Sequence, residues 1–195
     1  MSSRLTRAIG IRVVRGMAVA IAIGNDHFSP SFVGRAELML SDPRKPSTMR
    51  PYHWLARMAR EAAEPLVARD VATVHQAASK SVRAFVERLR KAKAVLRSAT
   101  IVSDGDPPKI GNPHLQAHAD ERRLFREATA AALDECGIDS IFLLEEQVTD
   151  KAATKIGVSA TRLEQWLTEI GATAGRPWRT DEKTAAVAAW IALTR

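Results

Sequence analysis

Residues 11–40, IRVVRGMAVAIAIGNDHFSPSFVGRAELML, decide the fold class of this chain. Residues 11–23 are apolar and rich in β-branched side chains, and a Gly-Asn-Asp turn follows them, so they predict a buried strand. Residues 32–40 alternate between two faces with a period of two, which is typical of a second strand. Because the connection between the two segments is short, we expect them to pair as an antiparallel hairpin.

Two helices are expected after this hairpin. The first covers residues 54–64 and ends near Pro65, because proline interrupts the hydrogen bonding of a helix. The second begins at Asp70, whose carboxylate is suited to capping the first free backbone amides, and continues to about Arg90.

The second half of the chain alternates strand and helix patterns. Residues 95–103 and 140–144 have the composition of buried strands, and residues 114–136 between them form an amphipathic helix. We therefore predict an α/β fold with a mixed sheet: an early antiparallel hairpin, then parallel α/β units, then a helical C-terminal part.

The expected domain organisation is simple. A chain of 195 residues suits one domain, here residues 11–195, preceded by a loose basic arm over residues 1–10. Residues 150–195 form the helical C-terminal segment of that domain.

Composition limits the class of protein. The chain is 46% hydrophobic with a net charge of +7, and this charge favours DNA or RNA as a partner, although an Arg-rich solvated surface explains it equally well. The single cysteine, Cys136, excludes an intrachain disulfide and fits a reducing cytoplasm. No apolar run reaches the length of a membrane span, and the basic residues before residues 16–24 are better explained by a buried strand than by a targeting segment.

The helix over residues 114–136 changes character along its inner stripe. The stripe is apolar at its C-terminal end, but at its N-terminal end it consists of His114, His118 and Glu121. Their spacing of i, i+4 and i+7 places them on one helix face, where they could share one divalent metal ion. Two alternatives stay open: His118 and Glu121 act as a base with its orienting group or bind a polar ligand, or the turn is merely polar.

Acidic residues follow the last two predicted strands. Asp104 and Asp106 end one, Glu145 and Glu146 end the other, and Asp181 opens the last helix. Because the carboxyl ends of parallel strands meet at one edge of a sheet, these groups could hold Mg²⁺ or Mn²⁺ for phosphoryl chemistry. The candidate catalytic residues are Asp104, Glu121, Glu146, Asp181 and His118.

Two further segments could contact nucleic acid. Residues 151–170 have the pattern of a helix-turn-helix, in which Thr161, Arg162 and Gln165 would face a groove of DNA. Residues 52–54, Tyr-His-Trp, follow a proline-rich loop and could stack on a base or pack on the sheet.

The order of the expected elements across residues 11–194 resembles that of the ribonuclease-H-like superfamily, which includes RuvC-type resolvases and the halves of actin-like kinases. The resemblance implies a nucleic-acid-processing protein whose carboxylates hold divalent metal ions. Members usually carry an Asp within the first strand, whereas the expected first strand here has none and Asp26 lies past its end. Since a two-metal centre is usually disabled by one missing ligand, we expect nuclease activity to be weak or absent.

A second resemblance is local. The segment HADERRLFR, residues 118–126, together with Pro177-Trp178 and residues 181–183, resembles a family of bacterial proteins without an assigned activity, so it implies none. Three functions therefore remain open: a ribonuclease-H-like nucleic-acid-processing protein, a DNA-binding protein that uses residues 151–170, and a non-catalytic module that binds a ligand or partner at His118 and Glu121.

Overall fold

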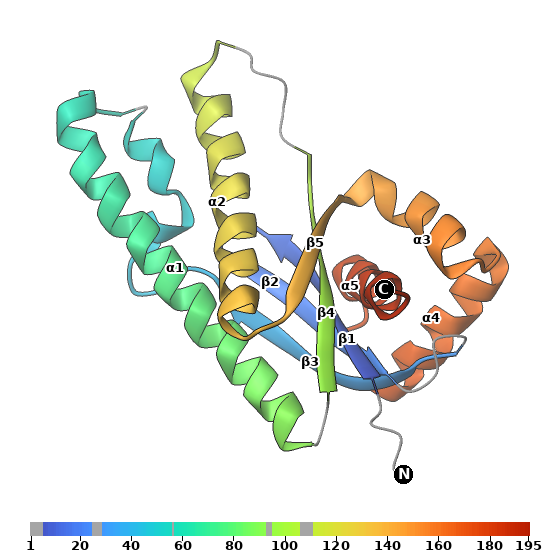
Figure 1. Cartoon of the computed structure of the whole chain (residues 1–195). Coiled ribbons are helices and arrows are strands. Elements are labelled where there is room, and N and C mark those ends of the chain that lie inside the picture. The colour runs from blue at the N-terminus through green and yellow to red at the C-terminus, as the bar shows by residue number, and fades with distance from the viewer. Residues whose placement is uncertain (1–5, 25–28, 56, 93–94, 106–110) are drawn as a thin grey trace.

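The computed structural model describes residues 6–24, 29–55, 57–92, 95–105 and 111–195 of the chain. A five-stranded sheet with the order β3-β2-β1-β4-β5 forms its centre (Figure 1). The strands are β1 (Thr6–Val14), β2 (Met17–Gly24), β3 (Ser31–Met39), β4 (Val95–Ser103) and β5 (Asp139–Leu144). Strands β1, β2 and β3 pair antiparallel, and β4 and β5 run parallel to β1, which confirms the predicted α/β class with a mixed sheet.

The prediction of one strand over residues 11–23 was wrong, because this run contains two. Strand β1 ends at Val14 and β2 begins at Met17, with Arg15 and Gly16 forming the turn between them. Arg15 has a φ of 40°, and a Cβ on Gly16 would lie 2.5 Å from Oγ of Ser41. The resulting antiparallel unit has three strands, and β1 starts at Thr6, so residues 6–10 belong to the sheet and not to a basic arm.

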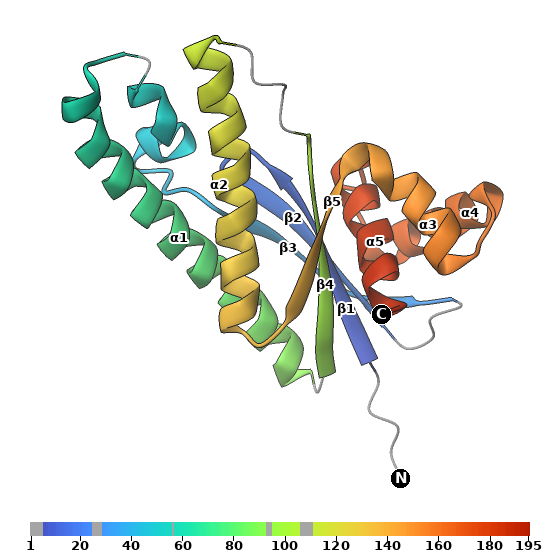
Figure 2. The same ribbon diagram turned by 45° about the horizontal axis from the view of Figure 1, so that its top comes forward.

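Helices cover both faces of the sheet (Figure 2). The helices α1 and α2 lie together on one face, and α5 packs on the other, with α3 and α4 beside it. The helices are α1 (Arg60–Lys91), α2 (Pro113–Glu135), α3 (Val148–Ile156), α4 (Ala160–Ala174) and α5 (Thr180–Leu193), and three short 3-10 helices are η1 (Pro46–Met49), η2 (Pro51–Trp54) and η3 (Glu145–Gln147).

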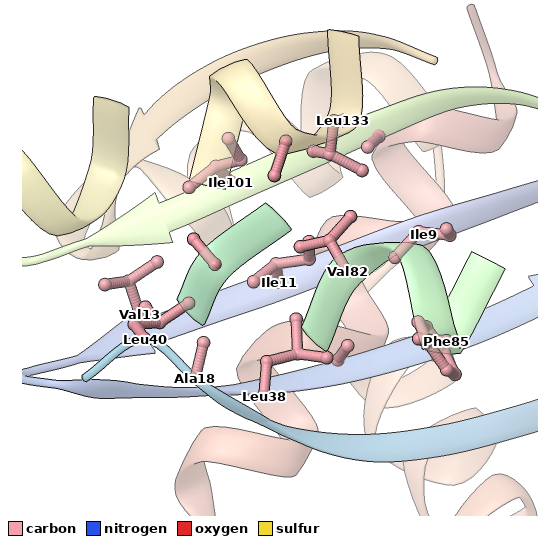
Figure 3. Close-up of a cluster of buried hydrophobic side chains, with 14 of the residues drawn as sticks. Ile9, Ile11, Val13, Ala18, Leu38, Leu40, Val82, Phe85, Ile101 and Leu133 are labelled. Carbon is pink, nitrogen blue, oxygen red and sulfur yellow. The ribbon is translucent and has the colours of Figure 1, made fainter. Parts of the chain in front are cut away.

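Strand β1 is buried on both faces. Its Ile9, Ile11 and Val13 join the core between the sheet and the pair α1 and α2 (Figure 3). Its Gly10 faces α5, where a Cβ would collide with the backbone of Ala185. Glycine at this position therefore lets α5 approach the strand closely. Arg12 lies two residues further along β1, so its side chain points to the same side of the sheet as Gly10.

Helix α1 begins earlier than predicted and passes through Pro65 without a break. Pro65 lies in the second turn of the helix, and its side chain is exposed. Because proline has no backbone N–H, one hydrogen bond near the helix start is lost, and the helix continues past it. Asp70 is consequently not a helix cap but a fully buried residue in the helix interior, where Oδ2 accepts a hydrogen bond of 3.0 Å from Nε1 of Trp54.

The C-terminal segment is helical, as expected. Ser159 caps α4 by accepting a hydrogen bond from the backbone N–H of Arg162, and Gly157 ends α3 with a φ of 72°. Among the described residues, the helices lack an apolar stretch of the length that a membrane crossing requires.

Candidate functional site

The carboxyl ends of β1, β4 and β5 meet at one edge of the sheet, and the first turn of α5 reaches the same edge. Asp104 follows β4, Glu145 follows β5, and Asp181 lies in the first turn of α5. The prediction that acidic residues at these element ends converge is therefore correct for Asp104 and Asp181, and Asp106 lies outside the described residues. Glu146 is exposed, and the adjacent Glu145 takes the place that was expected for it.

A buried arginine lies at the centre of these carboxylates. Nη2 of Arg12 donates hydrogen bonds to Oδ1 of Asp104 at 2.6 Å and to Oε2 of Glu145 at 2.7 Å. Nε of Arg12 lies 3.6 Å from Oδ1 of Asp181, so one guanidinium forms ion pairs with all three acidic residues. Only 7% of the Arg12 side chain is exposed, against 57% for Asp104 and 40% for Glu145.

The pKa values of Asp104 and Glu145, the two nearest partners of Arg12, are shifted in opposite directions. Partial burial would raise the pKa of Asp104, but the hydrogen bond and charge of Arg12, together with a hydrogen bond to Glu145 and the charge of Arg122, hold that pKa below its usual value. Partial burial also raises the pKa of Glu145, and there the attraction of Arg12 does not overcome it because Asp104 and Asp181 add repulsion.

This arrangement does not fit a two-metal centre. Such a centre needs carboxylate oxygens aimed at the ions, and here Nη2 of Arg12 takes one oxygen of Asp104 and one of Glu145 as hydrogen-bond acceptors. Moreover, the carboxylate that would complete the set is absent, because β1 carries Arg12 on the side of the sheet that faces Asp181. Arg12 is one of the basic residues before residues 16–24, and its position among these carboxylates was not predicted from the sequence.

A second polar cluster lies at the start of α2. Asn112 caps this helix, with its Oδ1 accepting a 2.9 Å hydrogen bond from the backbone N–H of His114. One turn later His118 follows on the same face, and the two imidazole centroids are 4.7 Å apart. The predicted grouping of His114, His118 and Glu121 on one helix face is thus present, and Oε2 of Glu121 lies 3.4 Å from Nδ1 of His118.

A third histidine, whose place in this group no spacing in the sequence indicates, completes the cluster. His53 of η2 is buried, its ring centroid is 4.8 Å from that of His118, and its Nδ1 is 2.7 Å from Oε1 of Glu121. The hydrogen bond from Trp54 to Asp70 fixes η2 against α1 and helps to hold His53 in place. The Tyr-His-Trp run therefore packs against the helices instead of presenting three free rings.

Burial dominates the electrostatics of this cluster. Burial raises the pKa of Glu121 to about 7, against the opposing charges of His118 and Arg50. Burial also lowers the pKa of His53, and the charge of Arg50 acts in the same direction.

A cavity of about 520 Å³ lies between the two groups of polar residues. Asp104 of the first group and His118 and Glu121 of the second are among its lining residues. Three arginines, Arg15, Arg50 and Arg122, also line the cavity, and Nη1 of Arg122 donates a 2.6 Å hydrogen bond to the carbonyl of Gly105. The cavity therefore offers several cationic groups to an anionic ligand.

The predicted helix-turn-helix corresponds to α3, the turn at Gly157, and α4. Thr161 and Gln165 are exposed on α4. Arg162 is half-buried and contacts Oγ of Ser29 at 3.3 Å. Whether these three residues read DNA stays a prediction, which the Arg162 variant below tests.

No protein-family model and no curated protein matches the sequence. Among solved structures, RuvC of Thermus thermophilus matches with a TM-score of 0.55 and 11% identity, over 95% of this chain and 92% of RuvC. RuvC of the same organism in complex with Holliday junction substrate matches with a TM-score of 0.55 and 12% identity, over 95% of this chain and 91% of that one. Identities this low support a shared fold only, and together with the sheet order they lead to one conclusion: this chain has the ribonuclease-H-like fold of RuvC.

Proposed function

We propose that this protein binds nucleic acid at the carboxyl edge of its sheet and does not hydrolyse it through a two-metal centre. The observation that carries the proposal is the pair of hydrogen bonds from Arg12 to Asp104 and Glu145. A guanidinium keeps its charge at all physiological pH values, so its single positive charge is always present beside these carboxylates and competes with any metal ion for them.

Charge and shape at this edge support nucleic acid as the ligand. The cavity beside Asp104 carries Arg15, Arg50 and Arg122, and guanidinium groups bind phosphate oxygens through paired hydrogen bonds. The net charge of +7 attracts a polyanion over a longer range. The similar RuvC structure that contains Holliday junction substrate suggests branched DNA as the first ligand to test.

The binding part of the proposal predicts a salt-sensitive interaction that depends on the cavity arginines. Replacing both Arg15 and Arg50 with Gln should weaken binding to branched DNA. The slope of log affinity against log salt should become shallower by about 0.9 for each arginine that neutralises a phosphate. Fluorescence anisotropy with labelled branched DNA, single-stranded DNA and an RNA–DNA hybrid, at several salt concentrations, measures both effects.

A matched control removes the same charge elsewhere. Lys80 and Arg83 are exposed on α1, and Arg83 forms a surface ion pair with Glu135. Their double replacement by Gln should leave the salt slope close to that of the wild type. Equal losses in the two double variants would contradict binding at the carboxyl edge and indicate a diffuse charge effect.

The second part of the proposal, the lack of hydrolysis, predicts no metal-dependent cleavage of nucleic acid by the wild-type protein. The same three nucleic acids are incubated with Mg²⁺ or Mn²⁺, and Asp104→Asn and Glu145→Gln are assayed in parallel. Turnover by the wild type that both variants lose would refute the proposal, because it would place catalysis on the carboxylates that Arg12 occupies.

The helix-turn-helix alternative is tested by Arg162→Ala. Because Arg162 already contacts Ser29 and Glu169, we expect this variant to change the affinity and the salt slope less than the Arg15 and Arg50 double variant does. A larger loss for Arg162→Ala, measured by the same anisotropy titrations, would move the nucleic-acid interface to α4.

A further inference from the structure

We propose that His53, His114 and His118 bind one divalent transition-metal ion of the zinc class, with Glu121 orienting the imidazole of His53. The three residues come from two segments, η2 and the first turns of α2, so the site forms only in the folded chain. One ring nitrogen from each histidine lies within 4.8 Å of the other two. Three such nitrogens can be gathered around one ion by small rotations of the rings, since zinc–nitrogen bonds are about 2.0–2.1 Å long.

The strongest evidence for a missing ligand is the unsatisfied nitrogen of His53. Its Nδ1 is taken by Glu121 at 2.7 Å, whereas its Nε2 is buried without a hydrogen-bond partner among the described residues. A buried ring nitrogen without a partner loses solvation and gains nothing in return. A metal ion bound at Nε2 would remove this deficit.

Glu121 has the position of a supporting group and not of a ligand. Its two oxygens face Nδ1 of His53 and Nδ1 of His118, at 2.7 and 3.4 Å. Histidines that bind metals commonly donate their second ring N–H to a carboxylate, which fixes the tautomer and the orientation of the ring. In this proposal Glu121 therefore supports the ligands, whereas the spacing in the sequence predicted that it binds the ion itself.

The chemistry of the donors selects the class of ion. Imidazole nitrogens prefer Zn²⁺, Co²⁺, Ni²⁺ and Cu²⁺ over Mg²⁺, which prefers oxygen ligands and keeps its waters. Three histidines leave a fourth position of a tetrahedral site to water or to another oxygen ligand. His114 is exposed and His118 lines the arginine-bearing cavity, so the site is accessible to ions and adjoins the proposed nucleic-acid surface without depending on it.

Cobalt binding provides a direct test. Untagged protein is first treated with a chelator, and Co²⁺ is then titrated while the visible absorption of tetrahedral cobalt is recorded. We expect one equivalent to bind, Zn²⁺ to displace it, and Mg²⁺ in large excess to leave the spectrum unchanged. A wild-type protein that gives no tetrahedral spectrum, or that binds Mg²⁺ equally well, would overturn the proposal.

Variants identify the residues involved. His114→Ala removes an exposed side chain, so it should fold normally and lose at least tenfold in metal affinity, whereas His75→Ala, an exposed histidine on α1, should bind as the wild type does. Glu121→Gln should weaken binding by about 10–100-fold, the range for loss of a group that orients a ligand, while retaining the tetrahedral spectrum at saturation. Equal affinities of the His114 and His75 variants would place the ion elsewhere and refute the site.

Discussion

Replacing Arg12 with Asp is expected to convert the carboxyl edge of the sheet into a site that binds divalent metal. The variant would place four carboxylates where the wild type has three carboxylates and one guanidinium. Without a cation these groups repel one another, so Mg²⁺ or Mn²⁺ should bind and stabilise the folded protein. At a metal concentration 100 times the dissociation constant the stabilisation is about 2.7 kcal/mol, which a thermal melt detects as a higher Tm.

The same variant should be less stable than the wild type when a chelator is present. Removing one partner of a fully buried ion pair costs about 3–5 kcal/mol. Here the partial exposure of Asp104 and Glu145 lowers this cost, and the repulsion from a fourth carboxylate in Arg12→Asp raises it. Arg12→Lys is the matched control, since it keeps a cation at the site and should show no rise in Tm with metal. A rise in the wild type as large as that in Arg12→Asp would show that the guanidinium does not exclude metal ions.

Trp166→Ala is expected to lower the free energy of unfolding by about 3–5 kcal/mol, the usual cost of truncating a large buried aromatic residue. Trp166 is 1% exposed, and its ring centroid lies 4.3 Å from that of Trp190 on α5. Its Nε1 also donates a 2.8 Å hydrogen bond to the carbonyl of Pro30, which ties α4 to the segment before β3. Urea denaturation followed by circular dichroism measures the loss.

Trp166→Phe separates the two contributions of this residue. Phenylalanine keeps most of the aromatic contact with Trp190 but cannot donate to Pro30, so it should cost about 1 kcal/mol for the hydrogen bond and more where the smaller ring leaves space. If the alanine variant were no less stable than the phenylalanine variant, α4 would not be anchored by this side chain.

The class of fold was predictable from the sequence, but the number of strands was not. The error lay in residues 11–23, which appeared as one apolar run. Strand β2 is buried on both faces, with Ala20 on the α1 side and Ile21 on the α5 side, so it lacks the alternation that reveals a half-buried strand. The turn at Arg15 and Gly16 then appeared to be an interruption of one strand instead of the boundary between two.

The candidate site was predictable only where it follows local periodicity. The spacing of His114, His118 and Glu121 placed them on one helix face, and the structure has them there. His53 joins them from 61 residues before His114, and no local pattern encodes such a contact. The predicted end of this strand at residue 144 agrees with β5, so the choice between Glu145 and Glu146 depended on which side chain reaches Arg12. No local pattern encodes that contact, because Arg12 and Glu145 are 133 positions apart in the sequence.

The pairing of Arg12 with Asp104 and Glu145 has a practical consequence for the biology of this edge. A metal ion comes and goes with its concentration in solution, but a guanidinium is covalently attached and cannot be chelated, diluted or exchanged. The positive charge at the centre of the edge is therefore always present in this protein. The identity of residue 12 alone decides whether that charge is part of the chain or has to come from a bound metal ion. Under the proposed function, a nucleic-acid strand bound at this edge would therefore stay intact in a buffer with EDTA as well as in one with Mg²⁺.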